Sequence, residues 1–363
     1  MKFLFVLPGS PAPIGGFKLL YEHGRMLQES GFEVRFLHVN GGLLRYAAKD
    51  NSLIIVAGRY LKFIWTNTFG RWKNYAYGTF GLISAWQQKL LQKNIDQADV
   101  LCLASWQLFA EVYDTFDVKH VKVIHPVMDY PGYMGPADEI YRSWTKDVAY
   151  FCISDYLYRA VRAHSNSTQI VNIGCVLPGG REELLVSSVN FSSIHNAGIL
   201  LTFSTGKYKN SGGTSNLIIA LRNRFPNEPI TVFGRPNRPA QLPADVNYLK
   251  NLSDHEVAGL YRSSSVFVFF SDFEGFGLMP LEAMRFGCPV VCTDCYGNRD
   301  YIAHNVNALV VAPGNIKAAV ESVDTLLKDE ILREKIGKAG LERSLEYLPE
   351  QFNGVIVGAY INV

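Results

Sequence analysis

The sequence predicts an α/β protein with two doubly wound domains, and three observations carry this prediction. At 363 residues the chain exceeds the usual size of one hydrophobic core, so two domains are expected. Short apolar runs alternate with segments of helical periodicity, as in proteins built on parallel sheets. The polar stretch FSSIHNAG at 191–198 divides these elements into two series, and we interpret it as a linker.

The first series precedes this linker. MKFLFVLPGS opens it with an apolar run but lacks the small-residue cleavage site of a signal peptide, so we interpret it as the first β-strand of a mature cytosolic protein. A stripe of leucines marks the helix that follows, which ends at Gly31. Strands are predicted at 2–7, 33–39, 52–57, 99–104, 121–125, 150–153 and 170–174, and helices at 17–30 and 80–95.

The second series follows the linker. Strands are predicted at 199–204, 229–234, 266–270, 289–293 and 307–311, and helices at 212–224, 253–263, 279–287 and onward to about 346. We assign 1–193 to an N-terminal domain and 194–346 to a C-terminal domain, and expect 347–363 to pack back on the first. Ligands of such folds bind beyond the carboxyl ends of the strands, so both domains should face a central cleft.

The composition is that of an ordinary globular protein, 48% hydrophobic and 19% charged, without an apolar run near the roughly 20 residues of a membrane-spanning helix. Six scattered cysteines, several of them in apolar runs, indicate buried reduced thiols, and the lone C-x-x-C at 292–295 lacks the second pair of a zinc site. Residues 1–100 hold 12 Lys and Arg against 6 Asp and Glu. This excess favours an anionic surface or substrate on that side, or else a solvated face without a partner.

The strand tip at 266–285, VFVFFSDFEGFGLMPLEAMR, is the most informative stretch. An apolar strand leads to Glu274, and Glu282 follows about one turn into the predicted helix. Gly275 and Gly277 let the backbone approach a ligand closely. The N–H groups at the helix start, with the dipole behind them, would suit a diphosphate. Taken alone, an acid near a helix start is also explained by that dipole.

This stretch and its flanks resemble a known family. LSDHE at 252–256 precedes it, and the spaced glutamate pair continues into EAMRFGCPVV at 282–291. The pattern resembles glycosyltransferase family 4, whose members are retaining, nucleotide-sugar-dependent enzymes with the GT-B fold. The resemblance is strong over 246–315 and weaker in the first domain, where such enzymes vary with their acceptor.

The resemblance implies roles for residues of the second domain. Glu274 would contact the donor sugar as a catalytic residue, and Glu282 would hold the nucleotide ribose. The backbone of Phe276, Gly277 and Leu278, beside Gly275, would cradle the distal phosphate.

Family members also carry two cations on the loop after the first strand of this domain, which here reads FSTGKYKNSGGTSN (203–216). Lys207 stands where the first, a catalytic donor-binding arginine, is expected, and Lys209 is the next candidate. Gly212-Gly213 replaces the usual Lys-Gly pair, which leaves the second cation open. Two such cations would stabilise the charge of the departing nucleoside diphosphate. The alternative for both lysines is a solvated surface position.

In the first domain, Gly15-Gly16 resembles the family's glycine pair beside the donor, although a Gly-Gly turn alone is weak support. VKVIHPVMDYPGY at 121–133 is predicted to end a strand on His125. That histidine resembles a catalytic family position near the donor sugar and acceptor, whereas a lone histidine is more often structural. Asp129 is a candidate on the acceptor side.

The stretch GRYLKFIWTNTFGRWKNYAYGTF at 58–80 mixes basic and aromatic side chains. Such mixtures suit an anionic membrane surface or a glycan, and an ordinary packed loop and helix is an equal alternative. Nucleic acid is not expected as a partner, because no nucleic-acid-binding module accompanies the stretch.

Together these features predict a glycosyltransferase. It would move a sugar, with retention, from a nucleotide diphospho-sugar to a hydroxyl of a glycan or lipid-linked acceptor in polysaccharide or glycoconjugate synthesis. The chain has no D-x-D triplet, which agrees with a metal-independent enzyme without a cofactor. We expect it in the cytoplasm, peripheral at the inner face of the membrane. The alternatives are a non-catalytic nucleotide-sugar-binding subunit and a GT-B phosphorylase or epimerase.

Overall fold

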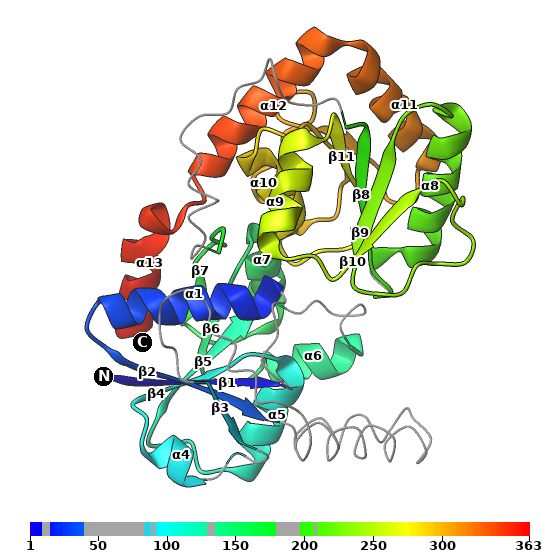
Figure 1. Ribbon diagram of the computed structural model, residues 1–363. Helices are drawn as coiled ribbons and strands as arrows, with labels where there is room; N and C mark the ends of the chain where they lie inside the picture. The colour runs from blue at the N-terminus through cyan, green and yellow to red at the C-terminus, as the bar shows by residue number, and fades with distance from the viewer. Residues whose placement is uncertain are drawn as a thin grey trace. The chain divides into compact units, whose positions relative to one another are not determined.

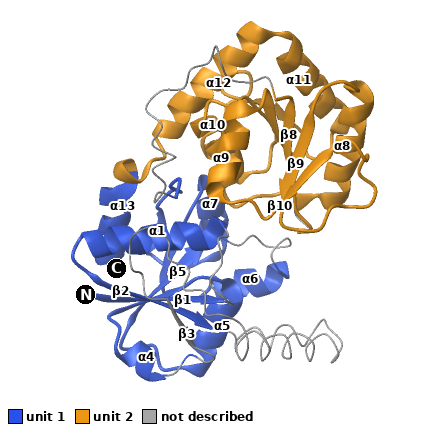
Figure 2. Cartoon of the chain, in the orientation of Figure 1, with its two compact units in different colours: residues 1–180, 352–363 blue, residues 181–351 orange. Residues whose placement is uncertain are grey.

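A computed structural model of the chain shows two compact units, which Figure 2 colours separately. Unit 1 comprises residues 1–180 and 352–363, and unit 2 comprises residues 181–351. Within these limits the structure describes residues 1–8, 15–39, 84–87, 90, 92–128, 135–178, 197–206 and 209–363. The predicted strand at 52–57 and the basic-aromatic stretch at 58–80 lie outside the described residues.

In its described residues, unit 1 is built on a seven-stranded sheet in which every pairing is parallel, with the order β3-β2-β1-β4-β5-β6-β7 (Figure 1). The strands are β1 (Lys2–Pro8), β2 (Glu33–Val39), β3 (Ser84–Gln87), β4 (Val100–Leu103), β5 (Lys122–Val127), β6 (Ala149–Cys152) and β7 (Ile170–Asn172). The helices are α1 (Gly15–Glu29), α4 (Gln92–Asp96), α5 (Trp106–Thr115), α6 (Ala137–Ser143) and α7 (Asp155–His164). The helix predicted over 80–95 is wrong at 84–87, where strand β3 lies; among the described residues of that range only 92–95 are helical, in α4.

Unit 2 is built on a six-stranded parallel sheet with the order β10-β9-β8-β11-β12-β13. The strands are β8 (Ile199–Phe203), β9 (Ile230–Gly234), β10 (Asn247–Lys250), β11 (Val266–Phe269), β12 (Val290–Thr293) and β13 (Leu309–Val311). The helices are α8 (Ser211–Arg224), α9 (Asp254–Ser263), α10 (Leu278–Arg285), α11 (Ile316–Lys328) and α12 (Glu330–Leu345), with a short 3₁₀ helix at Gly297–Asp300.

Apolar side chains from strands and helices form the core of unit 2. Helices α8 and α11 lie side by side on the sheet, and the core cluster includes Leu217 and Leu221 of α8 with Val323 and Leu326 of α11 (Figure 1). All four are fully buried. Burying a side chain of this size contributes roughly 1.5–3 kcal/mol, so this core fixes the strand ends on which the site depends.

The last helix, α13 (Pro349–Ile361), ends in unit 1. Tyr360 is fully buried there and packs edge-on against Phe3 and Phe151, with ring centroids 6.0 and 4.9 Å away. Its hydroxyl is hydrogen-bonded to His23 Nδ1 at 3.2 Å. Burial lowers the pKa of His23 to about 3, so this imidazole is neutral in the folded protein at neutral pH.

All six cysteines are free and buried, which confirms the prediction of buried thiols. Burial raises the pKa of Cys292 to about 12, so the thiol stays protonated and unreactive at neutral pH. Among the helices of the described residues, none combines the length and the hydropathy that crossing a membrane requires.

Candidate functional site

The strand order of unit 2 locates its ligand-binding edge. Strands are added outward from β8 to β10 on one side and from β11 to β13 on the other, so the order reverses between β8 and β11. In open doubly wound sheets, ligands bind beyond the carboxyl ends of the strands at such a reversal. The loops after β8 and β11 therefore form the candidate site, and they carry Lys209 and Glu274.

Backbone hydrogen bonds hold Glu274 against the loop that follows β12. The Glu274 N–H donates to the carbonyl of Cys295 at 3.0 Å, and the Gly297 N–H donates to the carbonyl of Glu274 at 3.2 Å. The two bonds make an isolated parallel bridge between Glu274 and Tyr296. The backbone at Glu274 is thus fixed as it would be in a strand, although it belongs to a loop.

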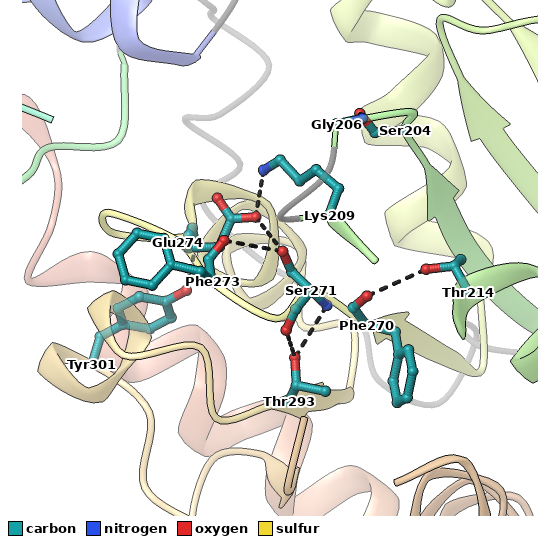
Figure 3. A network of polar contacts seen from close by, with 11 residues as sticks. Ser204, Gly206, Lys209, Thr214, Phe270, Ser271, Phe273, Glu274, Thr293 and Tyr301 are labelled. Atoms are coloured by element: carbon teal, nitrogen blue, oxygen red, sulfur yellow. Dashed lines mark hydrogen bonds and ion pairs between the residues drawn. The ribbon is translucent and has the colours of Figure 1, made fainter. Parts of the chain in front are cut away.

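The Glu274 side chain is nearly buried, and two groups approach the same one of its oxygens (Figure 3). Lys209 Nζ forms an ion pair with Oε1, and Ser271 Oγ donates a hydrogen bond to Oε1 at 2.8 Å. Only 11% of the Glu274 side chain and 24% of the Lys209 side chain are exposed. Burying a carboxylate without such partners would cost several kcal/mol. No described residue hydrogen-bonds Oε2, so that oxygen can accept a bond from a ligand.

Asn210 joins the two loops of the site. It caps α8, because its Oδ1 accepts a hydrogen bond from the Gly213 N–H at 3.0 Å, and its Nδ2 donates to Asp272 Oδ1 at 2.7 Å. A Cβ on Gly213 would lie 2.4 Å from that Oδ1, so the cap requires glycine there. Because Lys209 directly precedes Asn210, this link keeps Lys209 beside the loop after β11.

Helix α10 begins at Leu278, four residues after Glu274. Its N-cap is Gly277, with a φ of 84° that glycine adopts without strain, and no side chain caps the helix. The Tyr301 hydroxyl donates to the Gly277 carbonyl and holds this turn. A Cβ on Gly277 would lie 3.6 Å from the Glu274 Cβ, so the helix start and the carboxylate are adjacent. The N–H groups and the dipole of this end favour an anion.

Gly297 packs directly against the backbone of the site. A Cβ on Gly297 would lie 2.3 Å from the carbonyl oxygen of Gly275 and 2.6 Å from the Cα of Phe276. Both are main-chain atoms, which cannot turn away as the end of a side chain can. The loop between Glu274 and α10 keeps its position only because residue 297 has no side chain.

We expect Gly297→Ala to lower the free energy of unfolding by roughly 1–3 kcal/mol, because the methyl group must displace this loop. Urea denaturation measures that change. The same displacement moves Gly277 and the start of α10, so binding of nucleoside diphosphates should weaken as well, as isothermal titration calorimetry would show.

Gly259→Ala is the matched control. Gly259 lies inside helix α9, and no atom lies within 4 Å of a Cβ placed there. Alanine should raise the free energy of unfolding by roughly 0.5–1 kcal/mol, because glycine is a poor helix former. If Gly297→Ala were as stable as wild type, the close approach at Gly275 would not constrain the loop.

The structure places most of the predicted donor-site residues of unit 2 at this edge. Lys209 and Glu274 contact each other, Gly275, Phe276 and Gly277 form the turn, Leu278 starts α10, and half-buried Glu282 lies one turn further along the helix. Lys207 lies outside the described residues. Within the described part of the chain, His, Cys, Asp and Glu side chains form no group of three or more suited to a metal ion, and the predicted independence of metal stays a prediction.

In unit 1 the glycine pair starts helix α1, as the sequence suggested. Gly15 is its first residue, and a Cβ on Gly16 would lie 3.3 Å from Sδ of Met128, which directly follows β5. The start of α1 and the end of β5 are therefore adjacent. Asp129, the acceptor-side candidate, lies outside the described residues.

His125 does not end its strand, which corrects the prediction. Strand β5 continues to Val127 because its pairing with β6 runs on through Pro126, whereas its pairing with β4 stops at Ile124. His125 is 1% exposed, its Nδ1 lies 2.8 Å from the carbonyl of Leu103 in β4, and its ring stacks on Phe109 at 4.9 Å. Burial lowers its pKa to about 4, so the imidazole is neutral at neutral pH and packed within unit 1.

The two buried histidines predict a loss of stability in acid. Their pKa values are about 3 for His23 and about 4 for His125 in the folded chain, against 6.5 in an ordinary environment. Between pH 6.5 and about 4 the unfolded chain binds more protons, so the free energy of unfolding falls as the pH falls, by up to about 1.4 kcal/mol per pH unit for each histidine. Above pH 6.5 the two histidines no longer make the free energy of unfolding depend on pH. Urea titrations from pH 4.5 to 7.5 measure the slope, which His125→Phe should reduce; an unchanged slope would contradict the assignment.

Comparison with known proteins finds a family model and several relatives that match part of the chain. Residues 238–343 match the family model described as Glycosyl transferases group 1. The chain is 35% identical over 99 residues to the capsular polysaccharide biosynthesis glycosyltransferase CapM of Staphylococcus aureus, covering 27% of this chain and 26% of that protein. It is 37% identical over 99 residues to the sulfoquinovosyl transferase SQD2 of Arabidopsis thaliana, covering 26% of this chain and 19% of that one. The matched part thus spans about a quarter or less of these relatives.

Solved structures resemble the chain over its whole length. HepE of Anabaena in complex with UDP-glucose gives a TM-score of 0.71 at 15% identity, with 100% of both chains covered. Sucrose-phosphate synthase of Thermosynechococcus elongatus gives a TM-score of 0.68 at 14% identity, covering 100% of this chain and 99% of that one. These likenesses confirm the predicted fold class, GT-B, with one doubly wound sheet in each unit.

Proposed function

We propose that this protein is a retaining glycosyltransferase of family 4, which moves a sugar from a nucleotide diphospho-sugar to a hydroxyl of a glycan or lipid-linked acceptor. One observation carries the proposal. At the point where the strand order of unit 2 reverses, a nearly buried carboxylate, a lysine and the uncapped start of a helix lie together. A nucleotide sugar needs such a set, because it presents a neutral sugar beside a dianionic diphosphate.

Each group of the site suits one part of that donor. The start of α10 behind Gly277 offers N–H groups and a positive dipole to the diphosphate. Lys209 supplies a cation to the same charge. Glu274 Oε2 accepts a hydrogen bond from a sugar hydroxyl, and Glu282 accepts bonds from the ribose hydroxyls. In this proposal the sugar, the diphosphate and the ribose follow one another from Glu274 toward Glu282.

The proposed reaction depends on stabilising the leaving group. As the bond between the anomeric carbon and the phosphate oxygen breaks, negative charge grows on the nucleoside diphosphate, and Lys209 and α10 face it. Positive charge grows on the sugar, and the Glu274 carboxylate orients and stabilises it. The acceptor oxygen attacks the anomeric carbon from the face that the diphosphate leaves, and its proton passes to the departing phosphate oxygen, so the anomeric configuration is retained. These groups perform the work without a metal ion or cofactor.

The relatives support the general assignment, which is a glycosyltransferase of polysaccharide or glycoconjugate synthesis. CapM and the O-antigen chain mannosyltransferase B of Escherichia coli bear names from polysaccharide synthesis, and HepE was solved with UDP-glucose. We therefore place the chain in polysaccharide or glycoconjugate synthesis. A peripheral position at the inner face of the membrane is a separate part of the proposal.

A donor panel tests the proposal. UDP-glucose, UDP-galactose, UDP-N-acetylglucosamine and GDP-mannose are offered with and without glycan and polyprenyl-linked acceptors, and released nucleoside diphosphate is measured. We expect release that depends on the acceptor, and a product whose anomeric configuration, read by NMR, matches the donor. Donor binding without turnover would indicate a non-catalytic subunit. Release that needs phosphate or no acceptor would indicate a phosphorylase or epimerase.

A further inference from the structure

The hydroxyl of Thr293 extends the pairing of two strands beyond their regular end. Pairing between β11 and β12 stops at Phe269 and Cys292. One residue later, the fully buried Thr293 Oγ1 accepts a hydrogen bond from the Ser271 N–H at 3.1 Å and donates one to the Ser271 carbonyl. A single side-chain hydroxyl thus fixes both backbone groups of Ser271 (Figure 3).

Ser271 in turn holds the carboxylate of Glu274. It is 2% exposed, and its Oγ donates to Glu274 Oε1 at 2.8 Å. The carbonyl of Phe273, at 3.2 Å from Oγ, is the more distant acceptor for the single hydroxyl proton. The side chain of Ser271 has one torsion, its backbone is held by Thr293, and the residue is buried. The Oγ therefore defines where Oε1 lies.

The other anchor of Oε1 is of a different kind. Lys209 has a long side chain that remains 24% exposed, and a diphosphate at the start of α10 would attract its ammonium group. Once Lys209 turns to that diphosphate, Ser271 is the anchor of Oε1 that remains among the described residues. Without the Ser271 hydroxyl, rotation about the side-chain torsions of Glu274 would let its carboxylate move with Lys209.

We propose that Thr293 and Ser271 are positioning residues, which hold Oε1 of Glu274 so that Oε2 faces the donor sugar. Thr293 fixes the backbone of Ser271, and Ser271 fixes the carboxylate. This inference rests on the proposed function, since it assigns a supporting pair to the residue that would contact the sugar.

Thr293→Val, Thr293→Ser and Thr214→Val test the first step. The probes are the panel nucleotide sugar with the highest wild-type turnover and its nucleoside diphosphate. Thr293→Val should lower kcat about tenfold and weaken binding of the nucleotide sugar, while binding of the nucleoside diphosphate stays within about twofold of wild type. Thr293→Ser retains the hydroxyl and should restore kcat. In the control, Thr214→Val removes a hydroxyl that donates to the neighbouring Phe270 carbonyl at 3.3 Å, and it should cost stability without changing kcat.

Ser271→Ala tests the second step and serves if Thr293→Val fails to fold. It leaves the backbone bonds to Thr293 in place and removes the hydroxyl that donates to Oε1. We expect about a tenfold loss of kcat in an otherwise wild-type chain, and no further loss when Glu274 is already glutamine, because the two changes then affect one interaction.

The outcomes separate this inference from the function on which it rests. If wild type neither binds nor turns over any panel donor, the proposed function fails, and the inference with it. If wild type is active and Glu274→Gln is impaired, but folded Thr293→Val or Ser271→Ala keeps wild-type kcat, the inference alone is overturned. Losses equal for nucleotide sugar and nucleoside diphosphate, or additive to Glu274→Gln, would likewise show a merely structural role.

Discussion

Replacement of Glu274 by glutamine is expected to lower the turnover number for sugar transfer about 100-fold. Glutamine keeps the size of the side chain and can still accept a hydrogen bond, so the loss reports the negative charge. That charge stabilises the sugar as its bond to the diphosphate breaks. Steady-state kinetics on the panel donor with the highest wild-type turnover measures the change.

The same substitution should leave nucleoside diphosphate binding at least as tight as in wild type. Glu274 pairs with Lys209 in the ligand-free protein, so its charge competes with a diphosphate for the ammonium group. Removing the charge removes the competitor. Glu321→Gln, which alters an exposed pair with Lys317 on α11, is the matched control and should change neither quantity. Full transfer activity in Glu274→Gln would contradict the role assigned to Glu274.

The part of the site that could be predicted from the sequence is the part that is local in the chain. From VFVFF to helix α10, which holds Pro280 in its first turn, strand, glycine turn and helix start follow one another within about 20 residues. The spacing alone therefore placed Glu274 beside the start of α10, with Glu282 one turn further on. The core strands could also be predicted, because β11 is a continuous apolar run and only Thr202 interrupts the apolar run of β8.

One strand of unit 2 was missed because it lacks a local hydrophobic signal. Strand β10 is an edge strand of sequence NYLK with no buried residue, so no hydrophobic pattern marks it. The strand end predicted at His125 is also wrong, because pairing on the β6 side continues through Pro126 to Val127. Proline lacks an N–H but still accepts hydrogen bonds, which a strand can tolerate on one side.

Contacts between segments that are distant in the sequence could not be predicted either. Lys209 and Glu274 are 65 residues apart, and Thr293 lies 22 residues beyond Ser271. One signal could have found the second pair, because Ser271 and Thr293 both follow apolar runs that become adjacent parallel strands. Strands of one sheet end at a common edge, so hydroxyls placed there are expected to meet.

Replacement of Lys209 by methionine is expected to weaken nucleoside diphosphate binding by about 10- to 100-fold. Methionine keeps the length of the side chain but removes its charge, so the diphosphate loses one ion pair. Lys209→Arg, the matched control, retains the charge and should recover most of the affinity. Isothermal titration calorimetry at two salt concentrations measures both, and the wild-type affinity should fall more steeply with salt than that of the methionine variant.

The contrast between Lys209→Met and Glu274→Gln is the strongest test of the site, because the two residues form one ion pair. If the pair served only to hold the loops after β8 and β11 together, breaking it from either side would have the same consequence. If the groups bind different parts of the donor, the two changes diverge. The lysine variant then loses nucleoside diphosphate, whereas the glutamine variant keeps it and loses transfer. Equal effects on binding would contradict the division of the donor between Lys209 and Glu274.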